Sequence, residues 1–406
     1  MLSNSCMKLN LIIFCLFIVS IAEGQNTVPY DSITPLEPYN FVFGTISIGG
    51  NYQFSNESKL LEQAKHLRGM GSNIIKISLG QNAPRSYGLT LDNKPSTTLQ
   101  LFKASPEYKK VFDMDFKYIF AWVHTITGIE WKKGINAEQE KVLYDEMYEF
   151  ILYLLKGYNN SGKTFFIGNW EGDWLLHTNN NRNVDPPQEH VANMTKWLQI
   201  RQRAIDDAKK ASKARNVFLY YYVEVNLVLK GMQGKTCIAS QILPDLNVDF
   251  VSYSSYEAIK NRTYAEKKNT LDSVFNYLEK QLKPKDNLPF SRRVFIGEYG
   301  YHANINRPES FKKQYDETVD IVKISMELNL PFALHWQMYN NEYENGVSKE
   351  MSLINEKGEK TPLYLLHKKF YKEMNSYLMA FKAKNKAYPS DAEFKKKALE
   401  VLARLE

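Results

Sequence analysis

Apolar residues gather in eight short runs along most of the chain, and glycine, proline or polar residues bound each run. Runs of this length and setting predict buried strands. They lie at residues 41–47, 73–79, 118–124, 164–170, 217–225, 248–256, 293–299 and 331–339. Apolar positions at helical spacing predict helices at 58–70, 136–157, 189–214, 264–282, 309–328 and 362–379. Strands and helices therefore alternate along the chain.

Such alternation indicates a parallel sheet, and eight repeats in one domain favour its closure. The expected fold class is α/β: a (β/α)8 TIM barrel forming a single domain, with a C-terminal amphipathic helix. A dinucleotide-binding sheet is disfavoured because no Gly-x-Gly-x-x-Gly follows the first strand. Segments 81–98 and 179–187, rich in turn-forming and polar residues, are expected to be loops.

Both ends of the chain are expected to lie outside the barrel. Lys8 precedes the apolar run 9–22, and the small residues Ala22 and Gly24 frame a cleavage site. This pattern predicts a secretory signal peptide over 1–24, with an uncleaved anchor as the alternative. The barrel then covers 25–382 and a helical tail covers 383–406. We expect a secreted, extracellular protein with no stable membrane anchor, and a tail that packs on the barrel; a partner or membrane-surface role is the tail's alternative.

Composition narrows the class further. Hydrophobic residues make up 44% of the chain and charged residues 24%, which fits a globular protein. The net charge of +7 comes from basic residues interspersed with acids, so no nucleic-acid partner is expected. Aromatic residues make up 13%, which indicates a large core or a sugar-stacking surface. Once the signal is removed only Cys237 remains, so no internal disulfide is expected. Asn-x-Ser/Thr sequons at Asn56, Asn159, Asn193 and Asn261 are candidate glycosylation sites.

Two of the predicted strands deliver a glutamate at their carboxyl end. Glu171 directly follows the run 164–170, and Glu298 is the second-last residue of the run 293–299. A barrel gathers the carboxyl ends of all its strands at one mouth, so both side chains should meet there. Paired carboxylates suit glycoside hydrolysis, in which one donates a proton and the other attacks the anomeric carbon. A structural salt bridge is the alternative for either glutamate taken alone.

At this point the sequence resembles the large clan of retaining (β/α)8 glycoside hydrolases that includes cellulases, mannanases and β-galactosidases. The resemblance covers about residues 40 to 380 and implies that Glu171 is the acid/base and Glu298 the nucleophile. It also implies that Tyr256, or else Tyr253, hydrogen-bonds the nucleophile, and that Trp336 forms a sugar platform. It implies a β-linked substrate and no metal or organic cofactor.

The chain departs from the clan directly before the acid/base. The clan usually has Asn there to bind the sugar 2-hydroxyl, whereas this chain has Trp170, with Asn169 one residue further back. Either Asn169 reaches the site through a bulge in the strand, or this protein recognises the 2-position of the sugar differently. The basic residue of the second strand, often Arg in the clan, is Lys76 here.

Other polar residues near strand ends are weaker candidates for substrate binding. They are Asp173, Trp174, Glu224, Asn226 and His124. A loop or helix-start role is the alternative for Asp173, a salt bridge for Glu224, and a polar core contact for His124 and for His335. No His-x-His or His-Glu-x-x-His is present, so a metal hydrolase is disfavoured.

We therefore expect a secreted glycoside hydrolase that cleaves a β-glycosidic bond with retention, through a covalent glycosyl-enzyme. Its partner would be an oligo- or polysaccharide. The alternative is a catalytically inactive barrel that binds carbohydrate, which the departure at Trp170 favours. Burial near Trp170, Trp174 and Trp336, together with the charge of Glu298, is expected to keep Glu171 protonated.

Overall fold

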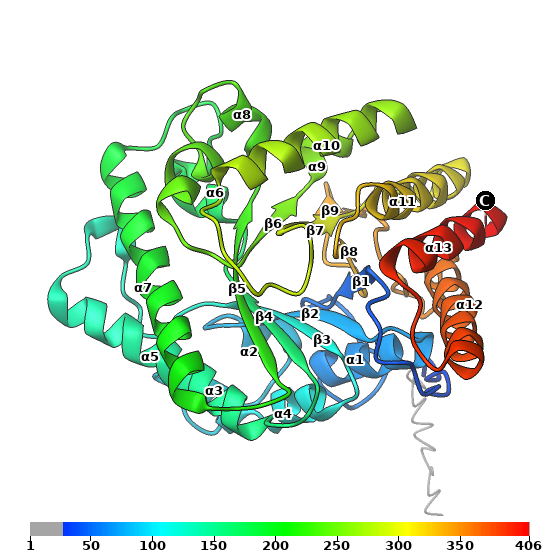
Figure 1. The fold of residues 1–406 in the computed structure, drawn as a ribbon, viewed down its shortest axis with the longest axis horizontal. Helices are drawn as coiled ribbons and strands as arrows, with labels where there is room; N and C mark the ends of the chain where they lie inside the picture. Colours follow the sequence, from blue (N-terminus) through cyan, green and yellow to red (C-terminus); the bar gives the residue numbers. More distant parts are fainter. Residues whose placement is uncertain (1–26, 406) are drawn as a thin grey trace, which may run out of the picture.

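The computed structural model describes residues 27–405, so the predicted signal peptide lies outside the described residues. Eight parallel strands pair in chain order, and β1 pairs with β8 to close the barrel (Figure 1). The strands are β1 (Phe43–Ile46), β2 (Ile74–Leu79), β3 (Tyr118–Val123), β4 (Thr164–Gly168), β5 (Phe218–Val225), β6 (Phe250–Ser254), β7 (Val294–Tyr299) and β8 (Ala333–His335). The predicted (β/α)8 barrel is confirmed, with each strand inside or overlapping its predicted run.

Long helices surround the barrel, as their apolar spacing predicted (Figure 1). They are α1 (Lys59–Met70), α5 (Ala137–Gly157), α7 (Gln188–Ser212), α10 (Tyr264–Gln281), α11 (Glu309–Glu327) and α12 (Pro362–Asn385). Local capping helps to set where they start. The Asn136 side chain accepts from the Gln139 backbone N–H, and the Gln139 side chain accepts from the Asn136 backbone N–H. This reciprocal capping box fixes the first turn of α5.

Short elements occupy the loops, and one segment predicted to be a loop is partly helical. The crossover from β2 to β3 contains α2 (Ala83–Tyr87), α3 (Thr98–Ala104) and α4 (Pro106–Asp113), so 81–98 is not wholly irregular. The others are α6 (Gly172–Leu176), α8 (Val228–Met232), α9 (Tyr256–Ile259), 3-10 turns at Trp131–Lys133, Thr178–Asn180 and Leu243–Asp245, a π-helical turn at Ile238–Ile242, and the hairpin of β9 (Tyr343–Glu344) and β10 (Val347–Ser348). Tyr256 therefore starts a helix after β6 rather than ending the strand.

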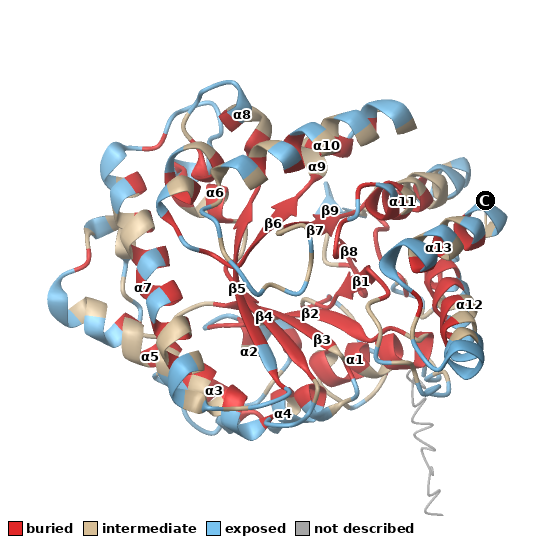
Figure 2. Ribbon diagram, in the orientation of Figure 1, coloured by how far each residue is buried: buried red, intermediate tan, exposed pale blue. Residues whose placement is uncertain are grey.

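Aromatic side chains fill the barrel interior, which supports the large-core reading of the aromatic content. Phe120 and Phe166 stack at 4.5 Å between ring centroids, and Phe295 and Phe332 pack against them edge-on or tilted. Figure 2 shows the strands buried and the outer faces of the helices exposed. Each such ring contributes about 1.5–3 kcal/mol through burial, so the interior below the mouth is a packed core.

The tail forms α13 (Asp391–Leu405), which packs beside α11 and α12 as predicted (Figure 1). Its apolar face, including Phe394 and Leu402, is buried, and the Phe394 ring lies 4.8 Å from that of Tyr39. The helix therefore belongs to the barrel's outer layer. Within residues 27–405 no helix combines the length and the apolar character needed to cross a membrane.

Candidate active site

A pocket of 490 Å3 opens at the carboxyl ends of the strands. Its lining comes from the ends of β4, β7 and β8 and from the loops beyond the strands. The lining residues are Trp170, Glu171, Tyr256, Glu298, His302, Trp336, Asn341, Glu342 and Met351. The structure thus brings Glu171 and Glu298 into one pocket, as their strand-end positions predicted. The volume falls within the range of small-molecule sites, about 300–1,000 Å3.

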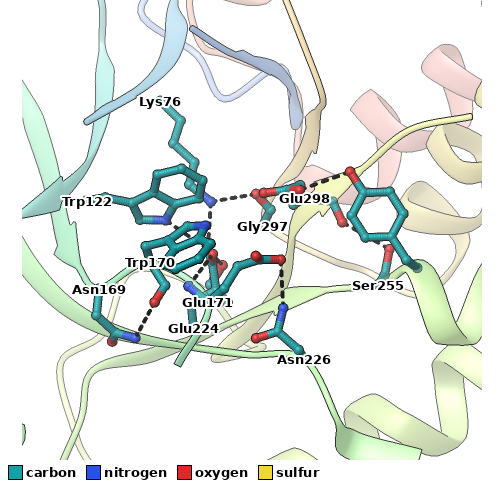
Figure 3. Close-up of polar contacts among 12 residues, drawn as sticks. Lys76, Trp122, Asn169, Trp170, Glu171, Glu224, Asn226, Ser255, Gly297 and Glu298 are labelled. Atoms are coloured by element: carbon teal, nitrogen blue, oxygen red, sulfur yellow. Dashed lines mark hydrogen bonds and ion pairs between the residues drawn. The ribbon is translucent and has the colours of Figure 1, made fainter. Parts of the chain in front are cut away.

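Glu171 follows β4 in a left-handed backbone conformation, with φ +26° and ψ 68°. Its Oε1 accepts a 2.8 Å hydrogen bond from Asn226 Nδ2 (Figure 3). The pKa of Glu171 is raised to about 7: burial is the largest cause, the negative charge of Glu224 adds to it, and Lys76 and Asn226 act in the opposite direction. A carboxyl group with this pKa retains its proton in a large fraction of molecules near neutral pH. That is the property a general acid requires.

Glu298 is the second-last residue of β7 and is only 5% exposed. Its Oε1 accepts a 2.9 Å hydrogen bond from the Tyr256 hydroxyl. Within residues 27–405, its buried Oε2 has no hydrogen-bond partner. Burial raises the pKa of Glu298 well above its usual value, and the Glu171 charge adds to this, while Lys76 and Tyr256 oppose it. The largest charge effect that raises the pKa of Glu171 comes from Glu224, and not from Glu298 as expected from the sequence; the Glu171 charge instead acts on Glu298.

Tyr256 and Trp336 occupy the places that the resemblance implied. Tyr256 bonds the Glu298 carboxylate although it lies in α9, and the Tyr253 hydroxyl instead donates to Glu257 at 3.2 Å. Trp336 directly follows β8 and lines the pocket. Trp170 also lines the pocket, so two indoles face the space between the glutamates and the loops. Flat aromatic surfaces of this kind suit stacking against the apolar face of a sugar ring.

The structure shows how Asn169 and Trp170, the two residues before Glu171, are placed relative to the pocket. Asn169 is 1% exposed and is not among the pocket-lining residues that the structure describes. Its Nδ2 donates to the carbonyl of Trp170 at 3.4 Å, and its Oδ1 has no partner within 27–405 (Figure 3). Asn169 therefore does not reach the pocket through a bulge. Trp170 holds that position in the lining.

Asp173 anchors loops and is not available to a sugar. Its Oδ2 accepts from the backbone N–H groups of Asn226 (2.7 Å) and Leu227 (3.0 Å), and its Oδ1 accepts from that of Ile238 (2.8 Å). The side chain is fully buried. The predicted sugar contact of Asp173 is therefore replaced by a structural role: it ties the loop after β4 to the loop after β5.

Three other candidates are not among the described lining residues. Glu224 is fully buried and pairs with Lys76 at 2.6 Å, so its salt-bridge alternative is the one found. Trp174 hydrogen-bonds the Glu171 carboxyl, and the Arg182 guanidinium lies 5.3 Å from its ring centre. His124 is half-buried just after β3 and is not part of the described lining.

The loops beyond β7 and β8 supply residues that the sequence patterns did not single out. His302, Asn341, Glu342 and Met351 all line the pocket. No strand-end rule marks them, because their position depends on loop paths fixed by tertiary contacts. Gln314 of α11, for example, donates to the carbonyls of Tyr301 and Glu350 at 2.7 and 2.5 Å, which holds the two loops together.

In the described part of the chain, no group of three or more His, Cys, Asp or Glu side chains is arranged so that it could hold a metal ion. The pocket is lined by the carboxyl groups of Glu171, Glu298 and Glu342 and by His302. Burial lowers the pKa of His302. The arrangement is suited to acid–base and nucleophilic chemistry carried out by side chains.

No protein-family model matches the chain, and no curated protein matches it. Solved structures do. A β-glucosidase from Exiguobacterium marinum is 12% identical, with 82% of this chain and 99% of that chain covered and a TM-score of 0.51. A calcium-binding mutant of Bacteroides uniformis β-glucuronidase 2 is 9% identical, with 82% of this chain covered and a TM-score of 0.50; the match spans 35% of that protein's length. This chain therefore has the (β/α)8 barrel fold that solved β-glycosidases have.

Proposed function

We propose that this protein is a glycoside hydrolase that cleaves a β-glycosidic bond with retention. The observation that carries the proposal is the convergence of Glu171 and Glu298 in one pocket, each on a strand end and each held by a side-chain donor. The fold shared with solved β-glycosidases agrees with it. The resemblance supplies the β linkage and the assignment of the two roles.

In the first step, the protonated Glu171 gives its proton to the glycosidic oxygen while Glu298 Oε2 attacks the anomeric carbon. The bond to the leaving group breaks as the bond to Glu298 forms. Tyr256 holds Oε1 and leaves Oε2 free for the attack. In the second step, Glu171 takes a proton from water as the water oxygen attacks the same carbon, which releases the sugar and restores both carboxyl groups.

The decisive experiment is hydrolysis of a panel of chromogenic β-glycosides and polysaccharides by wild type and Glu298→Ala. We expect turnover in wild type and its loss in the variant. A labelled 2-deoxy-2-fluoro glycoside should add one glycosyl mass to the peptide that contains Glu298, and the first product should keep the β configuration. Turnover with inversion, or turnover that survives Glu298→Ala, contradicts the proposal.

A carbohydrate-binding barrel without turnover is the second candidate, and the replacement of Asn by Trp170 before Glu171 favours it. It predicts that sugars bind wild type and Glu298→Ala equally while no substrate of the panel is cleaved. Isothermal titration with the same sugars separates the two functions.

We further propose secretion and glycosylation. The apolar run 9–22 supports export, and sequons Asn56, Asn159 and Asn261 have exposed side chains. Asn193, in α7, is partly buried and donates to the Lys132 carbonyl at 3.0 Å, which makes it the poorest acceptor. Expression in a eukaryotic secretory host, followed by glycan removal and mass measurement, tests both points. An unchanged mass contradicts glycosylation, and retention of residues 1–24 contradicts cleavage.

A further inference from the structure

A buried ion pair lies directly beneath the two pocket glutamates. Lys76 Nζ of β2 lies 2.6 Å from Glu224 Oε2 of β5, and both side chains are 0% exposed (Figure 3). Trp122 Nε1 and Ser252 Oγ donate to the same Oε2 at 3.2 and 2.7 Å. The Lys76 ammonium also lies 4.2 Å from the centre of the Trp122 ring. The pair spans the barrel between strands that are not neighbours.

Each member of the pair holds the backbone next to one pocket glutamate. Glu224 Oε1 accepts the backbone N–H of Glu171 at 3.2 Å, and Lys76 Nζ donates to the carbonyl of Gly297, the residue before Glu298, at 2.8 Å (Figure 3). Among the described hydrogen bonds, none joins Lys76 to the Glu298 carboxylate itself. The pair therefore acts on the main chain of both strands.

Both anchored points need such support. Glu171 has a positive φ of 26°, a region that costs a non-glycine residue about 1–3 kcal/mol and persists only when its surroundings hold it. At Gly297, a Cβ would lie 1.6 Å from Ser252 Oγ and 3.2 Å from Glu224 Oε2. The absence of a side chain there lets Ser252 and Glu224 approach the β7 backbone closely.

We propose that Lys76 and Glu224 are positioning residues that hold the main chain of Glu171 and Glu298 in register, and that the Glu224 carboxylate, held 3.2 Å from the Glu171 backbone N, keeps the proton on Glu171. The inference rests on the proposed hydrolase function. The hydrogen bonds to the main chain support the positioning role. The charge of Glu224 supports the role in protonation, because among the charged neighbours of Glu171 it has the largest effect on the pKa of Glu171, and it raises that pKa. Lys76 faces Glu224 from β2 and lowers the pKa of both pocket glutamates.

The test uses Glu224→Gln, which keeps the shape and the Oε1 acceptor but removes the charge and leaves Lys76 unpaired. The control is Lys267→Met, which breaks another buried pair, with Glu317 and Asp320, between α10 and α11. Two quantities are measured in the full-length protein. One is the titration midpoint of the Glu171 carboxyl by carbon-13 NMR, assigned with Glu171→Gln. The other is the pH profile of kcat/KM.

We expect Glu224→Gln to move the Glu171 midpoint below about 7 and to move the alkaline limb of kcat/KM with it. We expect kcat to fall about 10- to 100-fold with little change in KM, as misplaced catalytic groups do. Lys267→Met should lower Tm and leave both quantities unchanged. If Glu224→Gln does not fold, the double variant Lys76→Met with Glu224→Met tests the positioning role through the fall in kcat, because an apolar pair of similar volume can retain stability.

A folded Glu224→Gln protein with an unchanged Glu171 midpoint and kcat within twofold of wild type overturns the inference. The NMR readout is independent of turnover. A shifted midpoint in a protein that hydrolyses nothing refutes the proposed function and leaves the electrostatic role of Glu224 intact.

Discussion

Substitution of Asn226 is a direct test of how the pKa of Glu171 is set. It approaches Glu171 Oε1 at 2.8 Å, and its bond favours the ionised carboxylate and so lowers the pKa of Glu171. A hydrogen bond to a charged group contributes about 1.5–3 kcal/mol. Water will replace part of the lost amide in Asn226→Ala, so we take the lower end. At 1.36 kcal/mol per unit, the pKa of Glu171 should rise from about 7 to about 8.

The assay is kcat/KM between pH 5 and 9, whose alkaline limb reports the acid of the free enzyme. With a midpoint of 7, about a tenth of the protein keeps its proton at pH 8, against half for a midpoint of 8. The ratio of activity at pH 8 to activity at pH 6 should therefore be about fivefold higher in Asn226→Ala, even if total activity falls. An alkaline limb that stays in place, or moves to lower pH, refutes the reasoning.

Asn341→Ala is the matched control. Asn341 also lines the pocket, but its described hydrogen bonds join it to Gln337 and to the carbonyl of Ile48, not to Glu171. Its removal should change KM and leave the limb in place. A limb that shifts equally in both variants would mean that any loss of an amide from the mouth alters the titration, and the specific effect of Asn226 would be refuted.

Three further outcomes follow from charge and burial. Lys76→Met should lower the free energy of unfolding by about 3–5 kcal/mol in urea titrations, and adding Glu224→Met should recover most of it; equal losses in both proteins would contradict this. His335 is buried and neutral, with its pKa lowered to about 4. The unfolded chain binds that proton at about pH 6.5, so His335 makes stability fall as pH drops from 6.5 to 4, by up to about 3 kcal/mol, and His335→Gln should flatten the curve. The described lining holds Glu171, Glu298 and Glu342 but no Lys or Arg, so glucose should inhibit more strongly than glucuronate, and Glu342→Gln should narrow the difference.

Strand-level features were predictable because the barrel imposes strict rules. The eight apolar runs and the positions of Glu171 and Glu298 at strand ends follow from local pattern and from the shared mouth. The ion pair was readable too. On β5, Tyr220, Tyr222 and Glu224 share the interior face, and on β2 Ile74 shares it with Lys76. Because the other side chains on these inward faces are apolar, the two opposite charges are expected to pair with each other.

Roles set by loop geometry were not predictable from pattern. Asp173 reads as a pocket residue from its position near Glu171, but the turn of α6 directs its oxygens to the backbone N–H groups of the following loops. His302 and Glu342 reach the pocket only because contacts far apart in the sequence hold their loops. The position of Asn169, behind Trp170, depends on the backbone turn at Glu171, which no propensity indicates.

The interior of this barrel also argues that the Lys76–Glu224 pair exists for the site above it. Phenylalanine rings already fill the layers below, so the fold does not need charge to close. Removing two ions from water costs several kcal/mol each, and well-packed apolar residues in their place are often equally or more stable. Apolar side chains cannot accept a hydrogen bond from the Glu171 N–H, donate one to the Gly297 carbonyl, or place a charge beside Glu171 and Glu298. The pair lies at the depth where packing ends and the pocket begins, which is where those three tasks arise.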